Sequence, residues 1–487
     1  MIKIIEKAKI KLIELSLKLN DSTSADILVQ SFNYVPYLFI SKVNDPNING
    51  TTIDPKDIIY VKLHNSKFLP EIELYCDDSK GILFNDLYPF DHDTILSIFV
   101  KSNSENTMPI RMDFRVTSYE TIKAEISKNN FKYLIKGILD VDNLHYTNYE
   151  SKKGTSYEII KQMALEMNLG FASNVQSSND SMTWINPSDT YPEFIKNITR
   201  YSFISKDSFV WTFIDFQYNI NYINIQLELN EFIKEEKGTA TNPQVIKNDE
   251  EKNISLYLTN NSAFHMTNSY ISKFNLINQS FKVNLERFYQ VTSTWYDKND
   301  NTVYKEFIKE LKTEHNELKD LTDRSSEIYA ENVNDEYFTG KIDTGNNVHK
   351  NYSLAKVANK FHLDGMEKMK MIVILNQVNF SVKRFQNIKV EIYNPDDLFS
   401  SAANTKSSLN NINTKLSGYW FVTGINYLYK RNGGVEQEII LQRRELSTNY
   451  GSGNDEKNGF RTLLPLKNTT PYVQNVFDTS YGTKFNK

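Results

Sequence analysis

The stretch Tyr419-Trp-Phe-Val-Thr-Gly-Ile-Asn-Tyr-Leu-Tyr429 decides the fold, because its apolar side chains fall on both faces of an extended strand. Asn432-Gly433 interrupts the pattern, and this dipeptide readily takes the positive φ angles of a two-residue type I′ turn. Residues 435–446 then return with alternating apolar and charged side chains, as is typical of a partner strand. The stretch therefore predicts a β-hairpin whose first strand is covered on both faces.

The residues before this hairpin extend the same sheet. Apolar side chains alternate with polar ones along 379–392, where Val390 lies between Lys389 and Glu391. Residues 371–378 are apolar enough for a buried strand, and the spacing over 354–361 predicts a helix before it. We therefore expect a four-stranded antiparallel unit with one face covered by something other than water.

Bulk composition excludes several classes of protein. The chain has 487 residues, enough for about three or four domains, and its net charge of −4 gives no basic footprint for nucleic acid. Its only cysteine, Cys76, excludes a disulfide framework and indicates synthesis at a reducing site. Charged residues recur through the first twenty positions, unlike a signal peptide, and no apolar run approaches a membrane span. Aromatic residues make up 13% of the chain, which suits β-sheet packing and large interfaces.

The chain before residue 151 is predicted to form a β-rich domain, with a short helical arm at 1–8. About seven strands are expected, at 13–19, 32–43, 58–63, 71–76, 94–100, 109–117 and 131–141. Turn residues separate these strands, and several short strands of this kind favour a small barrel or sandwich.

Residues 151–235 change to a helical period and predict a small α/β module. One helix is expected to start at Thr155 or Ser156 and another at Asp189 or Thr190, because such side chains can accept orphan backbone N–H groups. Between the helices, Trp184-Ile-Asn-Pro187 is expected to be a turn. Two strands at 208–216 and 218–229 complete the module.

The rest of the chain carries weaker patterns. Residues 235–251 read as a charged linker, with strands expected at 254–258, 269–275 and 281–294. Apolar residues from Phe307 to Leu321 have helical spacing, which predicts an exposed amphipathic helix. The last segment cannot form a core of its own and is expected to lie on another surface through its apolar residues Leu463, Leu464, Tyr472 and Phe477. The predicted domains are therefore 1–150, 151–235, 236–349, 350–450 and an extended tail, 451–487.

No segment has the pattern of an active site. The seven histidines lack the spacing of zinc ligands, and the sequence contains no nucleophile elbow or phosphate-binding loop. Asp91-His92-Asp93 is more simply an exposed turn, Cys76 a buried thiol, and Asp140 with Asp142 a chance pair among 60 acidic residues. We therefore expect no catalytic residue, no metal site and no cofactor. The candidates for structural turns and interfaces are Asn432, Gly433, Trp184, Trp420, Leu463, Leu464, Tyr472 and Phe477.

Several segments, in chain order, resemble the central baseplate hub protein of contractile-tailed bacteriophages. Ser181–Thr190 with its Trp184, the helix 194–198 and the strand 206–215 resemble the middle of that family, and residues 13–22 its first strand. The order of a helix, two strands, Trp420-Phe-Val-Thr-Gly-Ile425 and the Asn-Gly hairpin resembles its end. The resemblance covers about 13–230 and 350–446 and extends to the hub part of type VI secretion spike proteins. The chain departs from the family's pattern at 44–57, 236–251 and 297–347 and after 447.

This resemblance implies a mainly β fold with α+β insertions. Two tube-type antiparallel β-barrels are expected, one before residue 151 and one at 350–450, with the small α/β module between them. Three chains would form a homotrimer with six barrels in a ring. The ring would continue a hexameric tail tube above, seat a separate trimeric spike below and contact other baseplate proteins. Genomic DNA would pass through the channel without specific binding. The resemblance thus predicts a virion protein made in the bacterial cytoplasm, without enzymatic activity or membrane insertion.

Two other functions remain open from the sequence. A receptor- or glycan-binding β-protein of a phage tail would place exposed aromatic residues on loops, whereas most tyrosine and tryptophan residues here fall within predicted strands. A tail-associated cell-wall hydrolase would need a positioned acid–base pair, for which the sequence offers no pattern.

Overall fold

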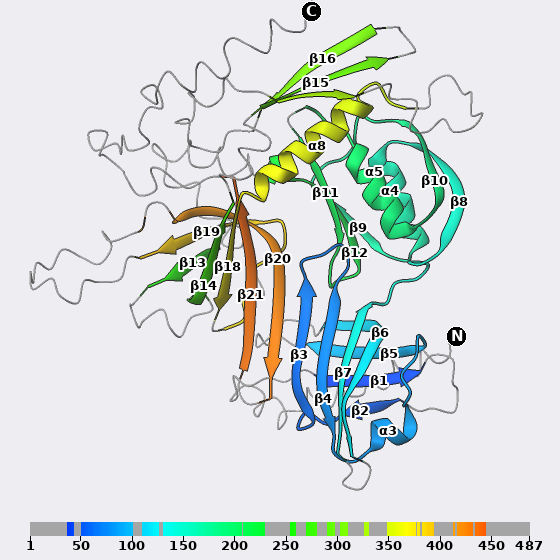
Figure 1. The fold of residues 1–487 in the computed structure, drawn as a ribbon, viewed down its shortest axis with the longest axis vertical. Coiled ribbons are helices and arrows are strands. Elements are labelled where there is room, and N and C mark those ends of the chain that lie inside the picture. Colours follow the sequence, from blue (N-terminus) through cyan, green and yellow to red (C-terminus); the bar gives the residue numbers. More distant parts are fainter. Residues whose placement is uncertain are drawn as a thin grey trace, which may run out of the picture.

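The computed structural model confirms the mainly β class with a small α/β module (Figure 1). It describes residues 37–42, 50–100, 110–125, 130–206, 208–228, 254–259, 269–279, 290–297, 302–309, 326–330, 348–375, 377–379, 382–393, 413, 416–431 and 434–444. The predicted helical arm, the strand at 13–19, the charged linker and the apolar tail residues lie outside these ranges. None of the helices described is long and apolar enough to cross a membrane.

One 13-stranded sheet runs through most of the molecule and contains two β-units. The first β-unit consists of β1 (Tyr37–Lys42), β3 (Ile58–Asn65), β4 (Glu71–Asp78), β5 (Thr94–Val100), β6 (Ile110–Glu125) and β7 (Asn130–Leu139). The short strand β2 (Thr51–Ile53) and helix α3 (Ile82–Asp86) accompany it. The second β-unit consists of β13 (Ser255–Leu258), β14 (Ile271–Asn278), β18 (Met369–Leu375), β19 (Asn387–Ile392), β20 (Gly418–Lys430) and β21 (Gly434–Arg443).

The two β-units have the same topology. If the strands of each unit are numbered from one to six along the chain, both units show the spatial order 2-3-6-5-4-1. This order is β3-β4-β7-β6-β5-β1 in the first unit and β14-β18-β21-β20-β19-β13 in the second. The outermost pair differs, since β1 and β5 are antiparallel whereas β13 and β19 are parallel. The chain therefore contains an internal structural repeat.

Two pairs of β-bulges align the units. The register of the fifth strand shifts at Thr117 between β6 and β7, and at Thr423 between β20 and β21. A second shift falls at Ile59 between β3 and β4, and at Ser272 between β14 and β18. When the ladders are followed outward from the first pair of bulges, they reach the second pair without an offset. Strand β6 has one more shift, between Thr121 and Lys123, that β20 lacks, so registers transfer between the units as far as Thr121.

The α/β module contains two helices and five strands. They are β8 (Thr147–Gly154), α4 (Ser156–Glu166), β9 (Gly170–Ser173), β10 (Met182–Thr190), α5 (Tyr191–Tyr201), β11 (Val210–Ile214) and β12 (Asn219–Asn224). The predicted pairing of the last two strands is confirmed. Both predicted caps are also confirmed, because Thr155 and Thr190 precede their helices and each pairs with a glutamate three residues later in a capping box.

Helix α8 (Tyr352–Met366) connects this module to the second β-unit, as Figure 1 shows. Its Asn359 side chain donates to the carbonyl oxygens of Thr199, Arg200 and Ser202, at 3.3, 3.1 and 2.8 Å. These are carbonyls at the end of α5, which has no further turn to accept their hydrogen bonds. The ring of Tyr352 also stacks on Tyr201 at 4.0 Å. The two helices are therefore joined by both polar and aromatic contacts.

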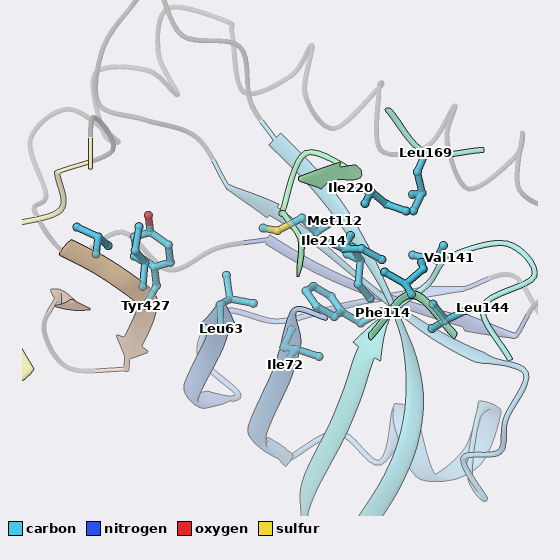
Figure 2. Close-up of a cluster of buried hydrophobic side chains, with 14 of the residues drawn as sticks. Leu63, Ile72, Met112, Phe114, Val141, Leu144, Leu169, Ile214, Ile220 and Tyr427 are labelled. Carbon is cyan, nitrogen blue, oxygen red and sulfur yellow. The ribbon is translucent and has the colours of Figure 1, made fainter. Parts of the chain in front are cut away.

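The core is shared between the first β-unit, the module and β20. Figure 2 shows apolar side chains from these three parts in one cluster. Its labelled members are Leu63, Ile72, Met112, Phe114, Val141, Leu144, Leu169, Ile214, Ile220 and Tyr427. All of them are buried. Burial of each such side chain stabilises the fold by about 1.5–3 kcal/mol, so separating the three parts would cost much of the stability of the fold.

Two sequence-based predictions are wrong. The expected turn around Trp184 is part of strand β10, where Trp184 pairs with Lys152 of β8. The segment expected to form an amphipathic helix from Phe307 begins in a strand, because Phe307 and Ile308 belong to β16 (Thr302–Lys309). Strand β16 forms a separate sheet with β15 (Gln290–Asp297) and β17 (Ser326–Ala330).

Strands β20 and β21 form the predicted hairpin, in which Lys430 pairs with Gly434. Asn432 and Gly433 of the predicted type I′ turn lie outside the described residues. The sheet extends across the boundary expected at residue 350, because β13 and β14 pair with β19 and β18.

Candidate assembly surface

Strand β20 joins the two β-units edge to edge. Its first residues pair with β19, from Gly418 to Phe421, and its last residues pair with β3, from Ile425 to Lys430. The other edge of β20 pairs with β21 along its length. Both faces of β20 are buried, as its apolar sequence predicts. We call the antiparallel contact between Ile425–Lys430 and Tyr60–Asn65 the junction.

Arg384 lies beside the junction and fastens its two sides. Its guanidinium donates to the carbonyl oxygens of Thr423, Ser66 and Lys67, at 2.7, 3.1 and 2.6 Å. It also donates to the Asn65 side-chain carbonyl at 3.3 Å. Burial lowers the pKa of Arg384 to about 9, so the side chain still carries its charge at neutral pH.

Aromatic rings complete the surroundings of this guanidinium. It lies 4.4 Å from the ring centre of Phe213 and 4.9 Å from that of Phe385. Phe213 belongs to β11 of the α/β module, so one side chain contacts both β-units and the module. Arginine suits this position because its planar fork offers several donors and its face stacks on rings.

A glycine allows the closest approach of the two units. A Cβ atom on Gly424 would lie 2.6 Å from the Cβ of Ser66 and 3.0 Å from the Cδ1 of Ile440. Distances this short are not found between carbon atoms in real structures, so any larger residue must push the first unit away. Gly424 therefore sets the spacing of the junction.

Two edges of the same sheet lack a strand partner among the residues described. Strand β6 pairs with β5 only as far as Arg115, and its remaining residues on that side, up to Glu125, face no described strand. Strand β14 ends the sheet at the other side and pairs only with β18 over 273–277. Unpaired edges of this length are ready to accept another strand.

Exposed apolar side chains lie on these edges. Tyr119 and Ile122 of β6 are 36% and 46% exposed, and Phe274 of β14 is 40% exposed. Such residues on an open strand edge are typical of a surface that is covered in an assembly. The two edges and the junction together form the candidate assembly surface.

Of the predicted interface residues, Trp184 and Trp420 lie inside the fold. Trp184 is 1% exposed, and its Nε1 donates to the Gly154 carbonyl at 3.0 Å. Trp420 is fully buried, its Nε1 donates to the Leu416 carbonyl at 3.0 Å, and Arg443 stacks on its ring. Both residues therefore stabilise the protomer. Asn432, Gly433, Leu463, Leu464, Tyr472 and Phe477 lie outside the described residues.

The residues considered for chemistry have structural partners. Asp91 pairs with Lys42 at 3.1 Å in an exposed turn before β5. Asp140 accepts from Arg115 at 2.8 Å, and burial raises the pKa of its carboxyl. Asp142 accepts from the Asn168 amide at 2.8 Å. In the described ranges no group of three or more His, Cys, Asp or Glu side chains could hold a metal ion.

Burial also raises the pKa of the Cys76 thiol, which is fully enclosed. A thiol in such surroundings stays protonated and is a poor nucleophile.

Sequence reasoning missed Arg384 and the two open edges. Arg384 carried no distinguishing signal, since it lies next to Lys383 in a stretch of mixed polar and apolar residues. The open edges carried none, because an edge is defined by pairing partners distant in the chain. The internal repeat was expected only from the resemblance, which implied two barrels in one chain.

The comparisons with known proteins cover sequence and structure. No family model matches the chain, and no curated protein matches it either. Among solved structures, a tail protein from Neisseria meningitidis MC58 aligns with 84% of this chain and 97% of its own, at 9% identity and a TM-score of 0.46. The 43 kDa tail protein of prophage MuSo2 from Shewanella oneidensis aligns with 84% of this chain and 99% of its own, at 10% identity and a TM-score of 0.47.

A third similar structure is an Escherichia coli component of the type VI secretion system, described as similar to bacteriophage T4 tail proteins. It aligns with 79% of this chain and 73% of its own, at 7% identity and a TM-score of 0.38.

Proposed function

We propose that this chain is a structural protein of a phage tail: a trimeric hub that joins a hexameric tail tube to a trimeric central spike. The internal repeat carries the proposal, because two β-units of the same strand order lie side by side in one chain. Three such chains would contain six similar units. One face of their ring can then match a sixfold neighbour while the chains keep threefold symmetry.

The sequence supports the same assignment through separate residues. Segments 181–215 and 354–425 resemble the baseplate hub family. Most of these residues lie outside the junction, so the resemblance supports the assignment separately from the contact between the two β-units. In this role the chain contacts the tail tube protein, the spike and other baseplate proteins in the virion, after synthesis in the bacterial cytoplasm. Its net charge of −4 suits a channel through which DNA passes without binding. The role is structural and needs no catalytic group or cofactor.

Electron microscopy of the full chain, alone and with the products of neighbouring genes, tests this function. Class averages are expected to show rings with three chains and six lobes. A preparation of the tail tube protein alone is the control, since its rings have six identical lobes and no threefold modulation. Single particles that persist in the presence of tube and spike proteins would contradict the hub.

A receptor- or glycan-binding role is the second candidate, and one observation favours it. Tyr149 is 81% exposed, Tyr146 is 57% exposed and Leu165 is 69% exposed, all on the α/β module. Exposed tyrosines provide stacking surfaces for sugars. Binding of the labelled chain to bacterial cells, lost on replacing both tyrosines by alanine, would support this role. Ring formation unaffected by that replacement, with no cell binding, would exclude it.

A further inference from the structure

The junction shows how one β-unit of this chain receives a neighbour. In the second β-unit, the last residues of its fifth strand, β20, leave the fourth strand and pair with the second strand of the other unit, β3. In the first β-unit, the fifth strand, β6, likewise continues beyond the fourth strand, β5, by about ten residues. The second strand of the second unit, β14, has a described partner on one side only over 273–277. The open part of β6 thus corresponds to the part of β20 that pairs at the junction. The open edge of β14 corresponds to the edge of β3 that receives β20.

We infer that β6 pairs with β14 of a second copy of this chain, in the register that the junction uses. The inference rests on the proposed ring and names the strands and residues that would join its protomers. A single chain cannot make this contact, because six strands separate β6 from β14 in the sheet. A head-to-tail contact between different edges builds a ring when its rotation closes.

The internal repeat fixes the register. The bulges at Thr117 and Thr423 align Tyr119–Thr121 with Ile425–Tyr427, as far as the further register shift in β6, and the bulges at Ile59 and Ser272 align β14 with β3. The junction pairs Tyr427 with Leu63 and Asn426 with His64. Transferred through the repeat, these pairs become Thr121 with Leu276, and Glu120 with Ile277.

The exposed side chains fit this register. Phe274 and Leu276 would share one face of the new ladder with Tyr119 and Thr121, because residues two apart point to the same side. Tyr119 and Phe274 would then be covered, which accounts for two of the large apolar side chains exposed in the protomer.

Disulfide cross-linking tests the register directly. Two double variants are made in the full chain, Thr121→Cys with Leu276→Cys, and Glu120→Cys with Ile277→Cys. Adjacent antiparallel pairs alternate between wide and narrow spacing, so one of the two has Cα atoms about 4.5 Å apart, within the range of a disulfide. The native Cys76 is fully buried and does not compete.

The matched control is Thr121→Cys with Lys273→Cys, which places both thiols on the same two edges but three residues out of register. Three residues along a strand span about 10 Å, too far for a disulfide. Each single-cysteine variant serves as a further control. All variants are co-expressed with the neighbouring tail proteins, oxidised mildly and separated on denaturing gels without reductant.

At least one in-register variant is expected to give covalent dimers and trimers, with no species beyond three chains, because a closed ring has no free edge. The control variants are expected to remain at least tenfold less cross-linked. Threefold rings without in-register cross-links, or with equal cross-linking of the control, would overturn the inference and leave the hub intact. Cross-links that continue beyond three chains would keep the strand pairing but contradict the trimeric hub. The absence of both rings and cross-links would contradict the hub and the strand pairing together.

Discussion

Thr117 and Thr423 occupy equivalent bulges in the two β-units and make the same hydrogen bond. The Thr117 hydroxyl donates to the Lys136 carbonyl and the Thr423 hydroxyl to the Ile440 carbonyl, each at 3.3 Å. Lys136 and Ile440 are themselves equivalent by the ladder registers. The repeat therefore extends from strand order to single contacts. The surroundings differ, because Thr423 is buried at the junction and Thr117 is exposed.

This difference gives the first prediction. Thr423→Val should lower the free energy of unfolding by about 1–2 kcal/mol, because it leaves a buried carbonyl without its donor. Thr117→Val should change it by less than about 0.5 kcal/mol, since water can replace the hydroxyl. Urea unfolding of the two variants measures both values. Equal losses would show that burial at the junction has no effect on this contact.

Arg384 is predicted to be the main polar fastening of the junction. Arg384→Ala should cost about 3 kcal/mol or more, because it leaves several buried carbonyls unsatisfied. Arg384→Lys should recover only part of this, since an ammonium cannot reproduce the planar fork or its stacking on Phe213. Lys383→Ala, at the exposed neighbouring position, is the control and should be nearly neutral. Calorimetry checks all three, and a neutral Arg384→Ala would refute the role.

Any side chain at Gly424 is expected to lower the stability of the protein, because the Cβ of Ser66 occupies the space beside it. Gly424→Ala is expected to cost about 1–3 kcal/mol through overpacking. The double variant with Ser66→Gly removes the facing Cβ and should recover about half of that loss or more. Thermal unfolding of the two single variants and the double variant completes a double-mutant cycle. Strict additivity would show that the two residues do not limit each other's space.

His349 should make stability depend on pH. Its Nε2 lies 3.0 Å from the Tyr201 carbonyl, and burial lowers the pKa of this imidazole. A depressed pKa in the folded state means that the unfolded chain binds the proton first. Stability is therefore full above the unfolded pKa of about 6.5 and falls as pH drops, by at most about 1.4 kcal/mol per pH unit.

Chemical unfolding between pH 7.5 and 5 measures this slope. His349→Gln should reduce this slope. Identical slopes in the two proteins would show that another group controls the pH dependence.

Local patterns predicted most of the strands and both helix caps of the module. Thr155 and Thr190 were predictable because a cap depends on residues within four positions. Strands such as β5 and β6 were predictable because one buried face imposes alternation. Trp184 was misassigned because Asn186-Pro187 resembles a turn, while its cross-strand partner Lys152 lies far away in sequence.

The candidate site was less predictable than the elements that form it. Trp420 was expected at an interface, but its indole is enclosed by its own protomer and by Arg443. The open edge of β6 depends on where β5 begins, and this is a property of pairing that Tyr119 or Ile122 cannot reveal alone. Equivalence of Thr117 and Thr423 likewise needs the ladders, since the flanking sequences differ.

The junction also sets a time order for making this protein. Asn65 and Asn426 meet across it, although 361 positions separate them in the chain. A ribosome must therefore finish almost the whole polypeptide before β3 can find β20, and until then β3 presents a bare edge to its surroundings. Because β20 joins the two β-units, a chain cut short by translation or proteolysis before residue 425 would lack the junction. In the proposed ring, such a chain would carry two β-units that are not held to each other.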